Sequence, residues 1–450
     1  MSSKKHVDMT DGSTVKHIIM FSLPLLFGNV FQLLYNTVDT WVVGNYVSDE
    51  AYSAVGSVGP IINMLIGFFS GLASGAGVVI SQFFGAGRYD RVKTAAHTSV
   101  LLTLVMTLAF TAVGVFGTPM FLRMMSTPDE VFPEARRYLT IYFAGIAGLL
   151  FYNIGAGILR AIGDSRRPFY YLVVSALLNT ALDLIFVIKF GMGVEGVAYA
   201  TVIAQGVSAV LVFATLFTTR LPVRLSLGVM KPDFPILGKI VRVGIPAAVQ
   251  MAITSFSNIF VQGYINYFGK NAMGAWTTFH KLDQFLLLPM QTVAISATTF
   301  VGQNLGAGKD ARAKRGVTVS LLLSLGSSAI IMIPLLIFAP YAVAFFNDSP
   351  DIVSLALKVV YWVTPMYLVC CYNQVSAAAL RGAGNAKVPM IIMVSSFVGV
   401  RQLYLFVMAN FISNTFIPIV YSMPVGWLAA SAALFVYNIF AKNTKRSLID

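Results

Sequence analysis

The chain contains the same sequence pattern twice, about half a chain length apart. Gln82 to Lys93 reads QFFGAGRYDRVK and Gln303 to Lys314 reads QNLGAGKDARAK, so that position 82 maps onto position 303 at an offset of 221 residues. Leu159 to Pro168 (LRAIGDSRRP) recurs at the same offset as Leu380 to Pro389 (LRGAGNAKVP). A constant offset through 450 residues predicts a duplicated helical bundle, a common way to build a membrane transporter whose substrate path lies between two halves.

The composition places both copies in a lipid bilayer. Hydrophobic residues make up 57% of the chain and charged residues 11%, at a mean hydropathy of +0.77, and no soluble core could bury so much apolar surface. Runs of about 20 or more apolar residues recur, each long enough to cross roughly 30 Å of hydrocarbon. We therefore expect an all-α polytopic membrane protein with twelve transmembrane helices in two pseudo-symmetric six-helix bundles, at residues 17–42, 53–81, 95–117, 136–157, 168–189, 194–219, 239–267, 274–301, 317–340, 353–379, 388–411 and 417–441.

The longest polar interruption, 220–238, is expected to be a cytoplasmic linker between an N-terminal lobe, 1–219, and a C-terminal lobe, 239–450. With the N-terminus in the cytoplasm, 23 of the 31 Lys and Arg residues fall on that side of a plasma (inner) membrane of bacterial type. The positive-inside rule then predicts that both termini are cytoplasmic. Contacts with anionic headgroups account for the net charge of +13, so no nucleic-acid partner is expected.

The sequence offers no pattern typical of an enzyme. The two cysteines, Cys370 and Cys371, are adjacent in a predicted helix, where a disulfide between them is geometrically implausible. No phosphate-binding loop with its lysine is present, and no nucleophile and base occur at one depth. The histidines lack carboxylate or cysteine partners at ligand spacing, so neither a transition-metal site nor a bound cofactor is expected (His6, His17, His97 and His280).

Ionisable residues inside predicted spans are the best indication of function, because each costs about 2.5–3.5 kcal/mol at a helix centre. Asp39 and Asp183 lie in the outer halves of spans one and five. Asn179 precedes Asp183 by four residues and so projects from the same helix face, and Thr201 lies about two turns into span six. Their oxygens suit Na⁺, and two adjacent carboxylates also share a proton readily. We expect these four residues to bind the coupling cation; the alternative is a set of ordinary interhelical hydrogen bonds.

These features together resemble the multidrug and toxic compound extrusion (MATE) family. The resemblance rests on the repeated halves, the G-A-G loop after spans two and eight, the LR-x-x-G-(D/N) loop after spans four and ten, and Asp39 with Asn179-x-x-x-Asp183. It covers essentially all twelve spans and implies a V-shaped pair of six-helix lobes around a central cavity. It also implies export of small organic cations in exchange for Na⁺ or H⁺, with the cation site at Asp39, Asn179, Asp183 and Thr201.

The second half departs from one branch of that family. NorM-type members also use carboxylates in spans seven and ten. The absence of these carboxylates from this chain favours a DinF-like assignment. In place of those carboxylates, this chain has uncharged amides (Gln250, Asn258, Gln262, Asn373 and Gln374).

The charges of the second half are arranged differently from those of the first. Subtracting the repeat offset places Arg401 at the position of Thr180 and Tyr404 at the position of Asp183, so the acidic pair has no copy there. We expect Lys281, Asp283 and Arg401 to form an internal salt-bridge network that offsets the cost of their burial. A role in substrate-linked gating is the alternative.

Three other functions share parts of this pattern. A flippase for lipids or lipid-linked sugars of the same wider superfamily would have this topology, but a phosphate headgroup favours a cationic cavity and the first lobe is acidic. A membrane-embedded enzyme needs converging catalytic groups, and a channel would show no saturable coupling to an ion. We expect a monomeric transporter for a small cationic molecule in the lipid bilayer.

Overall fold

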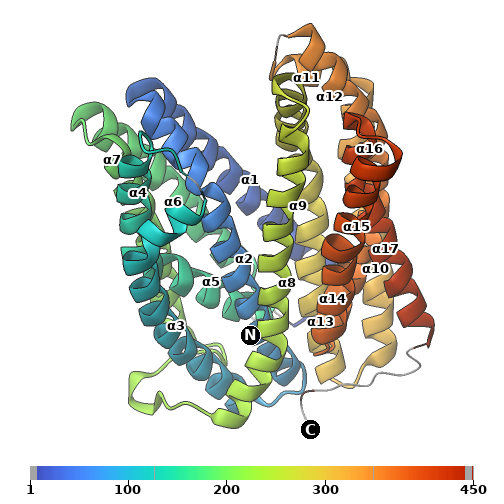
Figure 1. The fold of residues 1–450 in the computed structure, drawn as a ribbon. Helices are drawn as coiled ribbons and strands as arrows, with labels where there is room; N and C mark the ends of the chain where they lie inside the picture. Colours follow the sequence, from blue (N-terminus) through green and yellow to red (C-terminus); the bar gives the residue numbers. More distant parts are fainter. Residues whose placement is uncertain (1–7, 126, 348, 441–447, 449–450) are drawn as a thin grey trace. The chain divides into compact units, whose positions relative to one another are not determined.

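The computed structural model describes residues 8–125, 127–347, 349–440 and 448, and every regular element within these ranges is a helix (Figure 1). Eleven helical segments are long and apolar enough to cross a membrane. A twelfth span is the pair Phe132–Ala144 and Ile146–Ala161, which is bent by 46° at the break between them. The prediction of an all-α membrane protein with twelve spans is therefore confirmed.

The described chain divides into two compact units, the first of which contains Asp8 and Leu23–Ile245. Its helices are the later part of α1 (Thr14–Tyr46), α2 (Asp49–Gly85), α3 (Tyr89–Met124), α4 (Phe132–Ala144), α5 (Ile146–Ala161), α6 (Arg166–Asp183), the π-helix η2 (Leu184–Lys189), α7 (Gly193–Thr218), the short 3-10 helix η3 (Leu227–Val229) and the start of α8 (Phe234–Asn266).

The second unit contains Met9–Ser22 and Pro246–Leu448. After the start of α1 and the later part of α8, its helices are α9 (Lys270–Gly306), α10 (Asp310–Ile337), α11 (Ala339–Ala344), α12 (Pro350–Val363), the 3-10 helix η4 (Thr364–Met366), α13 (Tyr367–Gly382), α14 (Lys387–Val394), the π-helix η5 (Ser395–Val400), α15 (Arg401–Val407), the π-helix η6 (Met408–Ile412), α16 (Phe416–Val420) and α17 (Ser422–Phe440).

The first helix of each half changes unit along its length. Helix α1 passes from unit 2 to unit 1 after Ser22, next to Pro24, and α8 passes from unit 1 to unit 2 at Pro246. A proline inside a helix removes one backbone hydrogen bond and bends the axis, which suits a helix that packs in two environments. The start of each first helix thus belongs to the unit that is formed mainly by the other half of the chain. The predicted bounds 1–219, 220–238 and 239–450 follow the order of the chain and do not include this crossing.

The repeated G-A-G motif anchors these helix starts. In unit 2, the Met9 N–H donates to Gln303 Oε1 at 3.0 Å and Lys309 Nζ donates to Asp11 Oδ1 at 2.6 Å. This ammonium group holds the pKa of the Asp11 carboxyl below its usual value. Arg312 adds bonds to the carbonyl oxygens of Met9, Asp11 and Gly12.

Unit 1 repeats the arrangement with the segment that leads into α8. Arg91, from the first copy of the motif, pairs with Asp233 at 3.4 Å. The hydroxyl of Thr98 accepts the Asp233 backbone N–H at 3.1 Å. Each copy of the motif therefore holds the chain that enters the first helix of a half.

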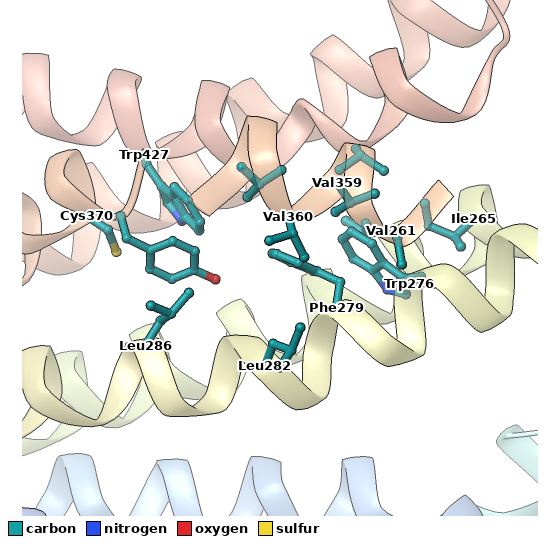
Figure 2. Packing of buried hydrophobic residues seen from close by; sticks show 14 of the residues in the cluster. Val261, Ile265, Trp276, Phe279, Leu282, Leu286, Val359, Val360, Cys370 and Trp427 are labelled. Atoms are coloured by element: carbon teal, nitrogen blue, oxygen red, sulfur yellow. The ribbon is translucent and has the colours of Figure 1, made fainter. Parts of the chain in front are cut away.

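The core of unit 2 is built on one face of α9 (Figure 2). Trp276, Phe279, Leu282 and Leu286 are buried and recur every three or four residues, the spacing that aligns side chains along one face of an α-helix. Figure 2 shows them packed toward residues of α8, α12, α13 and α17 (Val261, Ile265, Val359, Val360, Cys370 and Trp427).

Candidate functional site

Three of the four predicted coupling residues lie buried on two helices of unit 1. Asp39 is near the end of α1 and is 7% exposed, whereas Asn179 and Asp183 on α6 are 2% and 0% exposed. Helix α6 ends at Asp183, where the backbone continues as the π-helix η2. Short π-helical segments are rare and occur frequently at functional sites, because the wider turn re-aims the side chains beside it. Asp183 therefore lies at one of the three such segments in the described chain.

The two acids form a pair. The carboxyl groups of Asp39 and Asp183 lie at hydrogen-bonding range of each other, and such a contact is attractive only when a proton or another cation lies between them. Within the described part of the chain, no N–H or O–H group of another residue type donates to Asp39 Oδ1 or to either oxygen of Asp183. Buried carboxylates are normally satisfied, so these oxygens suit a cation.

The amide of Asn179 belongs to the same cluster by its position and its lack of partners. It lies one helical turn before Asp183, and neither its Oδ1 nor its Nδ2 has a hydrogen-bond partner among the residues that the structure describes. Leaving one buried polar atom unpaired costs about 1–3 kcal/mol. Carboxylate and amide oxygens are ligands that hard cations prefer, so this set fits Na⁺ as well as a proton.

Thr201 lies on a third helix of unit 1. It is buried on α7, where its hydroxyl donates to Val197 O of the same helix at 3.0 Å. This bond leaves the oxygen lone pairs of Thr201 available to a cation. The structure thus brings Asp39 and Asp183 together, with Asn179 beside them, and the part of Thr201 stays a prediction.

Two tyrosines interact electrostatically with the acid pair, and the sequence interpretation missed them. Tyr138 on α4 is buried and interacts electrostatically with both Asp39 and Asp183, and its ring stacks on that of Tyr142 at a centroid distance of 6.4 Å. Tyr35, one turn before Asp39 on α1, also interacts with it. The signal was present in the sequence, because Tyr35 precedes Asp39, and Tyr138 precedes Tyr142, by the four residues that align side chains on one helix face.

The predicted network of Lys281, Asp283 and Arg401 is not formed among the described residues. Asp283 Oδ2 instead lies 3.3 Å from His280 Nδ1, and Lys281 Nζ lies 5.2 Å from the centroid of the Phe346 ring. Residues two apart on a helix point in different directions, whereas residues three apart share a face. The network prediction is therefore wrong, as is the expectation that His280 has no carboxylate partner.

Arg401 is buried elsewhere in unit 2, at the start of α15. Its Nη2 donates to Ser257 Oγ at 2.6 Å and its Nη1 donates to Asn258 Oδ1 at 3.0 Å, both on α8. Across the described ranges, no group of three or more His, Cys, Asp and Glu residues is placed to hold a metal ion. The acid pair of unit 1 is therefore the strongest candidate cation site.

Comparison with known proteins agrees with the repeat and the fold. A model of the MatE family matches residues 24–185 and again residues 246–407. The chain is 26% identical over 441 residues to the probable multidrug resistance protein YoeA of Bacillus subtilis (strain 168), covering 96% of this chain and 95% of the relative. It is 24% identical over 343 residues to the multidrug export protein MepA of Staphylococcus aureus (strain MW2), covering 76% and 75%.

The solved structures show the same fold. One of them, described as an outward-facing conformation of a multidrug resistance MATE family transporter of the MOP superfamily, superposes with a TM-score of 0.92 at 22% identity and covers 99% of each chain. The family model matches well over half of this chain in two copies, which start at residues 24 and 246 and so lie 222 residues apart, close to the repeat offset of 221. The chain therefore belongs to the MatE family of multidrug and toxic compound extrusion transporters, and it is not an enzyme.

Proposed function

We propose that this transporter exports lipophilic organic cations in exchange for Na⁺ or H⁺ by alternating access, with Asp39 and Asp183 at the coupling site. The observation that carries the proposal is the buried acid pair, whose oxygens lack donors from other described residues. The relatives support the export of drugs, since they include a probable multidrug resistance protein and a multidrug export protein. The DinF-like assignment within the family stays a prediction.

The acid pair supplies a physical basis for coupling. A cation between Asp39 and Asp183 attracts both carboxylates and draws α1 toward α6, whereas the empty, ionised pair repels. A ligand shifts a conformational equilibrium only through its different affinities for the two states, and this change of sign provides such a difference. Asn179 and Thr201 would complete an oxygen shell for Na⁺, or orient the carboxylates if the ion is H⁺.

The substrate class is proposed from composition together with the relatives. Aromatic residues make up 13% of the chain and it contains 19 methionines, and aromatic faces and flexible thioethers suit flat, apolar cations of varied shape. The flippase alternative is less favoured, because two of the relatives that cover nearly the whole chain are named as probable multidrug resistance proteins.

The direct test is ion-driven efflux of ethidium from proteoliposomes that contain the purified chain. Separate Na⁺ and pH gradients identify the coupling ion, and we expect one of them to drive saturable efflux. Efflux that neither gradient accelerates would contradict the antiport mechanism. Movement of fluorescent anionic lipid without any ethidium transport would favour the flippase instead.

The orientation and the assembly state belong to the same proposal. We propose a monomer in the plasma (inner) membrane with both chain ends in the cytoplasm, although residues 1–7, 441–447 and 449–450 lie outside the described part. Cysteines introduced at Ser48 and Ser349 should react with an impermeant maleimide in intact cells. The native Cys370 and Cys371 are buried and provide a low background. If these cysteines react only after the membrane is made permeable, the chain has the opposite orientation to the one proposed.

A further inference from the structure

Arg401 is a buried cation that has no carboxylate partner among the residues that the structure describes. The residue is 5% exposed, and its two hydrogen bonds go to the uncharged groups Ser257 Oγ and Asn258 Oδ1. No residue in the described part of the chain accepts a hydrogen bond from its Nε. The ion pairs found within residues 8–125, 127–347 and 349–440 do not include Arg401. Hydroxyl and amide dipoles satisfy part of the guanidinium group but leave its charge uncompensated.

A purely structural role does not account for this charge. The polar cluster does join two helices, because Gln402 Nε2 also donates to Ser257 Oγ at 3.1 Å and the Ser257 hydroxyl donates to Phe397 O at 3.2 Å. A second neutral amide in place of Arg401 would make the same kind of clamp without a buried charge. Charged residues inside membrane spans are costly and generally serve function. The charge itself therefore calls for a ligand.

Arg401 lies in the segment of the second repeat that corresponds to α6, the helix that carries Asp183 in the first repeat. At the repeat offset of 221 residues, Arg401 corresponds to Thr180 on α6, and its partner Asn258 corresponds to Thr37 on α1. The same two helices of each repeat thus carry the acids in unit 1 and the guanidinium in unit 2. A π-helix adjoins both, since η2 follows Asp183 and η5 precedes Arg401. The two units thus carry opposite charges on corresponding helices, with Arg401 about one turn before the position that corresponds to Asp183.

A row of amides connects Arg401 with the surface of unit 2. Asn258 is exposed, and Gln262 and Asn266 follow it at successive intervals of four residues along α8. Gln262 Nε2 donates to Asn266 Oδ1 at 2.7 Å. Amides at this spacing neighbour one another on a helix, and a polar row on a membrane-spanning helix suits contact with water or a polar ligand rather than hydrocarbon.

We propose that Arg401, together with Ser257 and Asn258, binds an anionic group of the transported molecule, a carboxylate or a phosphate. The guanidinium group offers parallel N–H donors whose geometry matches these oxygens. The inference rests on the proposed efflux function and extends it, because the favoured substrates then carry an acidic group in addition to a cationic ring system. The acid pair of unit 1 binds the coupling ion, and Arg401 selects the substrate.

A matched pair of dyes tests this assignment. Rhodamine 110 has a free carboxylate and rhodamine 123 is its methyl ester, so the two share one cationic ring system. In proteoliposomes of phosphatidylcholine, we expect efflux of the acid to have a lower KM than efflux of the ester. Arg401→Gln should raise the KM of the acid about tenfold and leave that of the ester within twofold. Arg401→Lys should retain part of the preference for the acid, since lysine keeps the positive charge but lacks the planar pair of parallel N–H donors.

The controls separate this site from other effects. Lys358→Gln removes a positive charge from an exposed position on α12 of the same unit and should leave both dyes unchanged. An equal loss of both dyes with Arg401→Gln, or no preference in the unaltered chain, would overturn the substrate site. A defect that appears only when phosphatidylglycerol is added would assign the anion to a lipid headgroup and also overturn it. Failure of the unaltered chain to move either dye would contradict the proposed function itself.

Should Arg401→Gln fail to fold, Ser257→Ala tests the same site. It keeps the guanidinium but removes the hydroxyl that accepts its bond at 2.6 Å. We expect a selective rise in the KM of the acid, of severalfold. An unchanged ratio between the two dyes in this variant would count against the site.

Discussion

Replacing Asp39 and Asp183 together by asparagine should reduce ion-driven efflux to the rate of protein-free liposomes. The amides have nearly the shape of the carboxyl groups, but they cannot release a proton and they lack the charge that attracts Na⁺. The variant should still insert and fold, because it removes two buried groups whose ionised forms are costly in a membrane. The measurement is ethidium efflux under whichever gradient drives the unaltered chain, with yield and elution volume as the folding check.

Asp283→Asn is the matched control for this double variant. Asp283 is also a buried acid on a spanning helix, at 5% exposure, but its partner is His280 rather than a second acid. We expect it to impair efflux less, or to act through stability. Full ion-coupled efflux by the Asp39→Asn, Asp183→Asn variant would refute the coupling site and move the role to unit 2.

The second large effect is expected at Gly75, where the main chains of α2 and α8 lie close together in unit 1. A Cβ atom added at this position would overlap the Gly244 backbone and lie 2.8 Å from Ile240 O. These are main-chain atoms, so no side-chain rotation can make room and two helices must separate. We expect Gly75→Ala to lower the free energy of unfolding by about 1–3 kcal/mol, the usual cost of overpacking. Thermal unfolding of the purified protein in detergent measures it.

Gly77 provides the control on the same helix. A Cβ atom there would lie 3.7 Å from Gly157 O, an ordinary contact. Alanine favours a helix over glycine by about 1 kcal/mol, so Gly77→Ala should be neutral or slightly stabilising. Equal melting temperatures for Gly75→Ala and Gly77→Ala would show that the close approach contributes no stability.

The fold follows from the sequence because its main signals are local or periodic. The length of each apolar run and the repeat from Gln82 to Gln303 require no knowledge of partners. The close approach of Gly75 to α8 could not be predicted in this way, because it depends on a contact between segments far apart in the chain.

The candidate site was only partly predictable for the same reason. Asp39 and Asp183 could be paired because both are acids at similar depth in their spans. Arg401 was assigned to Asp283 through charge complementarity alone, whereas the structure gives it neutral partners on α8. Tyr138 was missed because its spacing from Tyr142 aligns the two side chains on one helix face but does not show that this face is directed toward the acids.

The exchange of helix starts between the units determines the order in which the protein can be completed during synthesis. Met9, which binds Gln303, leaves the ribosome 294 residues before its partner does. At roughly 5–20 residues per second, this delay lasts about 15–60 s. Unit 1 likewise lacks one of its helical segments until the start of α8 has been synthesised. The amino-terminal end of α1 must therefore wait in the nascent chain, and ribosome pauses between codons 23 and 303 should prolong the time in which this end is open to proteolysis.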